Sequence, residues 1–471
     1  MSLRTVVCMS LVLAAIEPSY AAPIDPPPPT PSRQPTARSG SASPAPQPTS
    51  TRAPAPVGPP IHSSIPYVAT RNDAVQDMLW MANVGKDDVV YDLGSGDGRI
   101  VIAAVRDFGA RRAVGIESDP QRIEEGRENA RKAGVTSKVE FIQGDLFTAD
   151  FRQASVVTLF LGHEPNLKLR PKMLRTLKPG TRIVSHQFGM GEWEPDKALT
   201  VRTLALGMWS EGANPFANNP RVPDYTGNEM HFGTSDKIAM WVVPAPIAGI
   251  WRGKIDTAQG SQDCQLVFHQ RLSQITGTFQ VSGQPKFAGR MPVDLWGSHL
   301  RFECNPEHMA YGQFQLRFDG QVHKNTMQGT LAVTDGGRPR ELAWQAKRDT
   351  TEYSGTWEWP CSTGDRLVKL KLERHDNGLV ATYLDQDQAI PVADVYDCGG
   401  GFYFTFLIGR DGGGLRITKD TGWLIGEGVV DEGSLKGTIE FYPYTGTGGL
   451  FESAGSKEPR IQNWAPRLIH P

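Results

Sequence analysis

The stretch VVYDLGSGDGR, residues 89–99, decides the predicted fold of this 471-residue chain. Residues 89–94 form a hydrophobic run of the length of a buried strand. Residues 96–108 follow with apolar side chains at helical spacing. A strand that enters a helix through a glycine-rich turn places that turn at the carboxyl edge of a parallel sheet, where open α/β folds bind ligands.

The same alternation continues on both sides of the turn, over residues 66–243. Strands alternating with helices at this spacing predict a parallel sheet covered on both faces, that is, a Rossmann-like α/β domain. Two later runs have no helix between them and predict an antiparallel hairpin that ends the sheet, with a long excursion at 210–235. The predicted strands are 89–94, 113–118, 139–145, 156–161, 182–188, 200–206 and 237–243, and the other predicted helices are 119–134 and 167–177.

The turn itself indicates which ligand it holds. A dinucleotide site uses Gly-x-Gly-x-x-Gly to seat a pyrophosphate, whereas this turn reads Gly-x-Gly-x-Gly with two acids. Asp92 and Asp97 would repel a pyrophosphate and suit a ligand with an ammonium and a sulfonium group. The sequence therefore favours S-adenosylmethionine (SAM) over NAD, with contacts from Asp92, Gly94, Ser95, Gly96, Asp97 and Gly98.

Two acids at the ends of the next strands extend this predicted site. Glu117 ends the second strand, where a carboxylate can accept both ribose hydroxyls. Its alternative role is a charge that caps the helix beginning near Pro120. Asp145 ends the third strand and is expected near the adenine amino group, or else serves as a turn residue.

Two blocks together resemble a known family. The opening Pro-Tyr-Val-Ala-Thr at 66–70 and Asp-Leu-Gly-Ser-Gly-Asp-Gly-Arg at 92–99 are similar to class I, seven-strand SAM-dependent methyltransferases. The likeness is to small bacterial members and to the lysine methyltransferases that act on the c subunit of the mitochondrial ATP synthase. It implies the strand order 3-2-1-4-5-7-6 with an antiparallel seventh strand. It also implies that Tyr67 and Thr70 lie over the cofactor.

The predicted acceptor side follows the fourth strand, at residues 161–166 (LGHEPN). Many amine and amide methyltransferases have Asp/Asn-Pro-Pro-Tyr/Phe here, and this chain lacks that motif. By position we expect His163 to act as a base, Glu164 to orient or deprotonate an amine, and Asn166 to contact the acceptor. The alternative is that Glu164 and Asn166 merely begin the next helix. His186 is expected to line the site or the core.

The N-terminal region predicts export. Residues 1–22 have the layout of a signal peptide, with Arg4 before a short apolar run and small residues ahead of a cleavage site after Ala21. Residues 23–60 hold fourteen prolines and are expected to form a disordered, extended linker. The predicted location is periplasmic or secreted, with cytoplasmic as the alternative, and no transmembrane segment in the mature chain.

After the methyltransferase-like domain, residues 61–245, the pattern changes to short β runs. A weak repeat relates Gly249-Ile-Trp251 to Gly355-Thr-Trp357 and predicts two antiparallel β domains, 246–350 and 351–471, each a barrel or a sandwich. The Gly-x-Trp start is similar to the first strand of lipocalin- or avidin-like barrels. In an exported chain, the four late cysteines suggest local disulfides, Cys264 with Cys304 and Cys361 with Cys398.

The expected function is methyl transfer from SAM to an unidentified acceptor, either a protein lysine or a small molecule. The alternative is an exported binding or envelope-interaction protein that retains an inactive methyltransferase scaffold. The formal net charge of −2 gives no reason to expect a nucleic-acid partner. No Cys/His cluster indicates a metal site.

Overall fold

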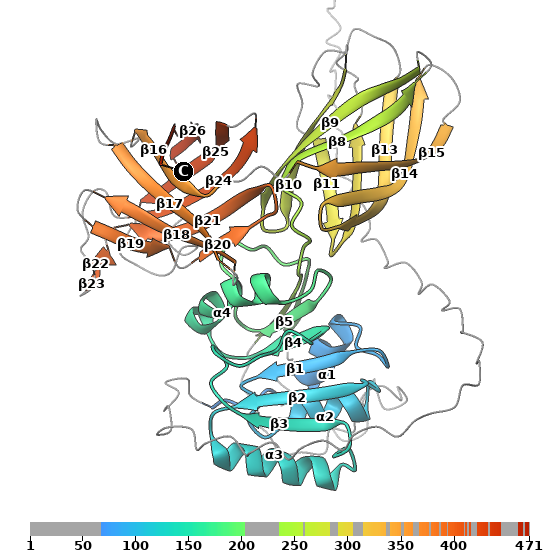
Figure 1. Ribbon diagram of the computed structural model, residues 1–471. Helices are drawn as coiled ribbons and strands as arrows, with labels where there is room; N and C mark the ends of the chain where they lie inside the picture. The colour runs from blue at the N-terminus through green and yellow to red at the C-terminus, as the bar shows by residue number, and fades with distance from the viewer. Residues whose placement is uncertain are drawn as a thin grey trace, which may run out of the picture. The chain divides into compact units, whose positions relative to one another are not determined.

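The computed structural model describes residues 67–202 and, with gaps between strands, residues 235–470. Its first domain is a seven-stranded sheet in the order β3-β2-β1-β4-β5-β7-β6, which confirms the predicted order (Figure 1). The elements are α1 (Asn72–Met81), β1 (Val89–Leu93), α2 (Arg99–Arg106), β2 (Arg112–Glu117), α3 (Pro120–Lys132), β3 (Val139–Gln143), β4 (Val156–Leu159), α4 (His163–Thr176), β5 (Arg182–His186), β6 (Lys197–Arg202) and β7 (Ser235–Val242).

Local sequence signals explain where these elements begin and end. All five residues of β1 are buried, as a strand covered on both faces requires. Helix α3 begins where the Asp119 carboxylate accepts from the Gln121 amide, with Pro120 in the first turn, and ends before Gly134 at a φ of 69°. Helix α1 was not predicted, although its buried face packs into the core on one side of the sheet through Ala74, Val75, Met78 and Leu79.

Strands β1 to β5 run parallel, and β7 pairs antiparallel with both β5 and β6. The predicted terminal hairpin is therefore present, shifted by a few residues at each end. Most of the predicted 210–235 excursion lies outside the described residues. The carboxyl ends of β1, β2, β4 and β5 meet at one edge of the sheet, which is where an open α/β fold binds its ligand.

The first β unit is a closed eight-stranded barrel, so the barrel alternative holds for it (Figure 1). Its interior is packed with large apolar side chains, among them Trp251, Phe268, Phe302 and Phe318. The strands are β8 (Gly249–Thr257), β9 (Gly260–Arg271), β10 (Gln274–Val281), β11 (Met291–Trp296), β12 (His299–Cys304), β13 (Phe314–His323), β14 (Thr326–Asp335) and β15 (Arg340–Arg348).

The second β unit has two five-stranded sheets, β19-β18-β17-β16-β27 and β20-β21-β24-β25-β26, and a two-stranded hairpin of β22 and β23. The strands are β16 (Gly355–Pro360), β17 (Leu367–His375), β18 (Gly378–Asp385), β19 (Gln388–Val392), β20 (Asp394–Asp397), β21 (Gly401–Ile408), β22 (Arg410–Asp411), β23 (Gly414–Leu415), β24 (Gly422–Asp431), β25 (Ser434–Pro443), β26 (Arg460–Trp464) and β27 (Arg467–His470).

The weak sequence repeat corresponds to a repeated local contact. The Trp251 indole donates to the carbonyl of Ile247 at 2.8 Å, and the Trp357 indole donates to the carbonyl of Tyr353 at 3.0 Å. Each tryptophan thus closes on the backbone four residues earlier. Such a bond satisfies the indole N–H of a buried ring, which otherwise carries a desolvation cost.

The predicted disulfides are wrong. Cys264, Cys304 and Cys398 are buried free thiols, and Cys361 lies outside the described residues. Cys264 is on β9 and Cys304 on β12, with β10 and β11 between them in the barrel wall. That separation is about three strand spacings, or roughly 14 Å, whereas a disulfide needs Cα atoms within about 7 Å. The cysteines therefore give no support to the predicted export.

The predicted signal peptide, residues 1–22, and the predicted proline-rich linker, residues 23–60, lie outside the described residues. Within the part of the chain that the structure describes, none of the helices has the length and hydropathy needed to cross a membrane.

Candidate cofactor and acceptor site

The glycine-rich turn after β1 adopts a backbone that only glycine tolerates well. Gly94, Gly96 and Gly98 have φ angles of 83°, 52° and 78°. The amides of Gly94 and Ser95 both donate to the carbonyl of Ile116, at 2.8 and 3.0 Å, so the turn folds over the end of β2. A Cβ atom at Gly96 would overlap the ring of Tyr67. A Cβ atom at Gly94 would lie 2.7 Å from a methyl carbon of Leu161, so two neighbouring side chains pack closely on the turn.

Glu117 lies beside this turn at the end of β2. Its carboxylate accepts from the Gly96 amide at 2.9 Å and from the amides of Ser118 and Asp119 at 2.8 and 3.0 Å. The predicted alternative, a carboxylate at the start of α3, is therefore also present in the geometry. The Ser118 hydroxyl also donates to Oε1 at 3.3 Å, so three donors occupy Oε1, and only Oε2, which accepts from Gly96, has room for a further donor.

Asp92 differs from the other acids because it is buried inside the sheet. Only 3% of its surface is exposed, and its carboxyl group accepts from the Thr158 hydroxyl at 2.8 Å. Burial raises the pKa of Asp92 to about 7, although the bond from Thr158 acts in the opposite direction. A cation bound near the turn would favour the ionised carboxylate.

Replacing Asp92 by asparagine is expected to flatten the pH dependence of stability. The folded pKa of about 7 lies above the unfolded value, so wild-type stability falls as pH rises from about 4 through 7. The variant cannot ionise and should gain on the order of 3 kcal/mol over wild type between pH 5 and pH 8. Urea unfolding of both proteins at pH 5 and pH 8, without cofactor, measures this difference. An equal change in the free energy of unfolding between the two pH values in both proteins would contradict the prediction.

Asp97, the second acid of the turn, forms an ion pair with Arg99. It pairs with Arg99 at 2.6 Å, and Arg99 also donates to the carbonyl of Thr70 at 2.7 Å. Burial alone would raise the pKa of Asp97, but the bonds and charge of Arg99 outweigh it and hold the pKa below its usual value. Asp97 and Arg99 thereby fasten the opening block to the glycine turn.

Tyr67, the aromatic residue of the opening block, lies directly on this turn. Its ring is against Gly96 and carries the Arg122 guanidinium at 3.9 Å from the ring centroid. The residue is 44% exposed, so one side of the ring faces away from the turn. Tyr67 therefore lies on the turn, and Thr70 is joined to it through Arg99, whereas their place over the cofactor stays a prediction.

Of the two other predicted contacts, Asp145 accepts a local hydrogen bond, whereas the buried Ser95 hydroxyl only packs against its neighbour. The Ser95 hydroxyl lies against Gly115 of β2, beneath the turn. The Asp145 carboxylate accepts from the Phe147 amide at 2.9 Å through one oxygen, and so forms the predicted turn. The second carboxylate oxygen leaves Asp145 an acceptor at the edge of the sheet, whereas Ser95 faces inward.

The three predicted acceptor residues begin α4 but differ in exposure. Glu164 is exposed and His163 half-buried, and neither makes a side-chain hydrogen bond to another described residue. Asn166 is fully buried, and its amide nitrogen donates to the Ser185 hydroxyl at 3.0 Å and to the carbonyl of Phe188 at 3.1 Å. Asn166 therefore holds the backbone in place and does not reach solvent.

Sequence reasoning named His186 at this edge but missed Phe160, Phe188 and Asp236 near it. His186 at the end of β5 has its Nε2 atom 3.2 Å from the carboxylate of Asp236 in β7. Burial lowers the pKa of His186 despite that carboxylate. The Phe160 ring lies 4.2 Å from His186 and 6.2 Å from Phe188, measured between ring centroids. Positions 160 and 188 fall at the carboxyl ends of the predicted strands 156–161 and 182–188, which was the available signal; Asp236 gave none.

Comparison with known proteins decides the family. The ANTKMT methyltransferase domain model matches residues 92–197. A protein-lysine N-methyltransferase of Saccharolobus islandicus is 46% identical over 137 residues, which is 29% of this chain and 85% of that protein. The chain belongs to the ANTKMT family of class I SAM-dependent methyltransferases.

Other relatives of this methyltransferase match the same domain. The mouse adenine nucleotide translocase lysine N-methyltransferase is 34% identical, over 35% of this chain and 71% of its own length. The human lysine N-methyltransferase of the ATP synthase c subunit is 30% identical, over 36% and 69%. A Salinibacter ruber structure, described as an RNA methyltransferase with S-adenosyl-L-homocysteine, is 45% identical over 38% and 94%, with a TM-score of 0.29.

The methyltransferase uses SAM as its methyl donor, and the residues at the carboxyl edge fit that cofactor. The Gly94 and Gly96 backbone lies at the carboxyl edge beside Glu117 and Asp92, which supply acceptors and negative charge for a cationic ligand. The described residues contain no group of three or more metal-ligating side chains.

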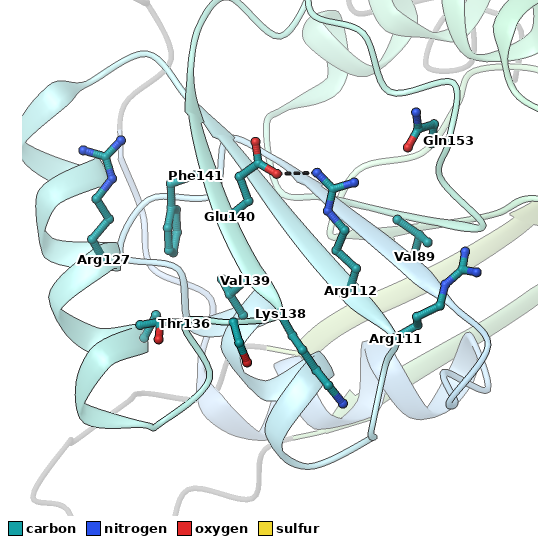
Figure 2. Close-up of a pocket in the computed structure, with 12 residues that line it drawn as sticks. Val89, Arg111, Arg112, Arg127, Thr136, Lys138, Val139, Glu140, Phe141 and Gln153 are labelled. Atoms are coloured by element: carbon teal, nitrogen blue, oxygen red, sulfur yellow. Dashed lines mark hydrogen bonds and ion pairs between the residues drawn. The ribbon is translucent and has the colours of Figure 1, made fainter. Parts of the chain in front are cut away.

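The methyltransferase also has an open pocket of about 740 Å³, at the opposite end of the sheet (Figure 2). It is lined by Val89, Arg112 and Val139, the first residues of β1, β2 and β3. Arg112 pairs there with Glu140, as the dashed line shows. Ligands of this fold bind at the carboxyl ends, so this pocket is separate from the cofactor site. Charged side chains here also protect the exposed edge strand β3 from pairing with another chain.

Proposed function

We propose that this methyltransferase modifies lysine side chains of proteins. The observation that carries the proposal is its 46% identity to a protein-lysine N-methyltransferase over 85% of that relative. The two animal relatives are also named as lysine methyltransferases. The proposed cofactor contacts are Glu117, Asp92, Asp145, Tyr67 and the backbone of the glycine turn. Asp97 and Thr70 are proposed to act mainly through Arg99.

When bound, SAM supplies an electrophilic methyl group on a sulfonium. A lysine ε-ammonium must lose a proton before the resulting lone pair forms the new N–C bond, while the S–C bond breaks and its electron pair stays on sulfur. We propose that exposed Glu164 attracts the lysine ammonium and that His163 accepts its proton. Phe160 and Phe188 would pack against the methylene stem of the lysine.

Tritiated SAM with the purified full chain tests this proposal. We expect label in poly-L-lysine, recovered as methyllysine after acid hydrolysis, and none in poly-L-arginine. A Glu117→Ala variant is the matched inactive control. Label that enters only an RNA transcript would replace the lysine proposal with RNA methylation.

The same preparation tests the scaffold alternative. Isothermal titration with SAM should give a micromolar dissociation constant for an enzyme. No binding at millimolar SAM would instead support an inactive scaffold. The predicted signal peptide stays a prediction, and mass spectrometry of the mature N-terminus would test it.

A further inference from the structure

Helix α4 carries a buried arginine that the proposed chemistry does not use. Arg170 is 2% exposed, and its guanidinium pairs with the Glu192 carboxylate at 2.8 Å. The same nitrogen donates to the carbonyl of Met190 at 2.6 Å. Burying a guanidinium lowers the stability of the fold unless its charge is paired and its N–H groups are hydrogen-bonded. These partners therefore hold the Arg170 side chain in one position.

Two tyrosines of the second β unit, far away in the chain, bond to this pair of Arg170 and Glu192. The Arg170 Nε donates to the Tyr396 hydroxyl at 3.1 Å, and the Tyr403 hydroxyl donates to Glu192 at 2.6 Å. The rings of Tyr396 and Tyr403 stack with centroids 5.7 Å apart. Both tyrosines belong to the same buried apolar cluster as Leu169 of α4.

The pair Arg170 and Glu192 in turn fixes the segment that follows β5. Asn166 and Arg170 lie four residues apart, and therefore on one face of α4. From that face Asn166 donates to the carbonyl of Phe188, and Arg170 donates to the carbonyl of Met190. The segment 187–190 is thus tied to α4 at two points. Its Gln187 has a φ of 67°, a conformation that needs such support.

This segment and the start of α4 form the acceptor side of the site. Phe188 is 36% exposed and faces Phe160 after β4, while His163 and Glu164 begin the helix whose next turns hold Arg170. A displacement of about 1 Å at such a position is enough to slow a group transfer by about a hundredfold.

We propose that Tyr403 and Tyr396 are positioning residues for methyl transfer, through which the second β unit fixes Arg170 and hence the acceptor side. The second β unit is then part of the catalytic apparatus and not a separate attachment. The proposal rests on methyl transfer at the carboxyl edge of the sheet. Only the measurement of kcat described below also rests on lysine as the acceptor.

A pair of tyrosine variants in the full chain separates this role from a general contribution to stability. Tyr403→Phe removes only the hydroxyl that bonds Glu192. Tyr353→Phe is the matched control, because Tyr353 is a buried tyrosine of the same β unit whose hydroxyl bonds another acid, Asp397, at 2.8 Å. The Tyr353 hydroxyl also bonds the carbonyl of Gly401 at 3.2 Å, again within the second β unit.

For Tyr403→Phe we expect amide hydrogen exchange in peptides covering 163–192 to accelerate about tenfold. The kcat for poly-L-lysine should fall about tenfold, while the dissociation constant for SAM stays within twofold of wild type. Tyr353→Phe should leave all three values near wild type. Equal effects of the two variants, or unchanged exchange in Tyr403→Phe, would overturn the proposal. If wild type does not methylate poly-L-lysine, the lysine proposal fails while the exchange measurement still decides this one.

Discussion

Replacing Arg170 by methionine is expected to lower the free energy of unfolding by about 3–5 kcal/mol, since it leaves a buried carboxylate without its cation. Burial raises the pKa of Glu192, but the charge and hydrogen bond of Arg170, with the bond from Tyr403, outweigh it and hold the pKa below its usual value. Without the guanidinium, the Tyr403 hydroxyl is left to compensate the Glu192 charge. Urea unfolding at pH 7 measures the loss.

A double variant distinguishes an unpaired charge from lost packing. Removing both charged groups, in Arg170→Met with Glu192→Leu, should restore part of the stability that the single variant loses, because no unpaired charge remains, while the buried Tyr403 hydroxyl still loses its bond to Glu192. A loss below about 1 kcal/mol in the single variant would show that the pair contributes little.

Replacing Glu117 by alanine is expected to weaken SAM binding by about 30- to 1000-fold. The variant loses the proposed charge-assisted bonds to ribose, which together are worth about 2–4 kcal/mol. It also loses the bond that holds the Gly96 amide in the turn. Isothermal titration of the full chain measures the change, and circular dichroism checks that the variant is folded.

The matched control for Glu117→Ala is Glu124→Ala on α3. Glu124 is an exposed acid whose contact with Arg127, at 3.7 Å, is on the surface. We expect it to bind SAM as wild type does. Wild-type affinity in Glu117→Ala would show that the cofactor lies elsewhere.

The helices and strands of the methyltransferase domain could mostly be predicted, because the signals that mark them lie close together in the sequence. The buried run of β1, the glycine turn and the Asp119-Pro120 helix start each involve neighbours in sequence. The hydrophobic periods give the succession of elements along the chain, whereas the order of strands in the sheet was predicted from the family resemblance. Helix α1 was missed although its buried residues, Ala74, Val75, Met78 and Leu79, have helical spacing.

The site was predicted less completely, because its remaining contacts join distant segments. Arg99 is two residues from Asp97, yet its bond to the Thr70 carbonyl needs the folded chain. Asp236 reaches His186 only through the antiparallel pairing of β7 with β5. The disulfide prediction failed for the same reason, since spacing along the chain does not show which barrel strands are neighbours.

The distance along the chain between α4 and its tyrosine partners has a consequence during synthesis. Arg170 and Tyr396 are separated by 226 residues, and Tyr403 lies 211 residues after Glu192. At about 5–20 residues per second, the ribosome needs roughly 10–45 seconds to add the missing partners. For that interval the nascent methyltransferase domain exposes an uncovered arginine and carboxylate, and a prematurely terminated chain would keep them exposed.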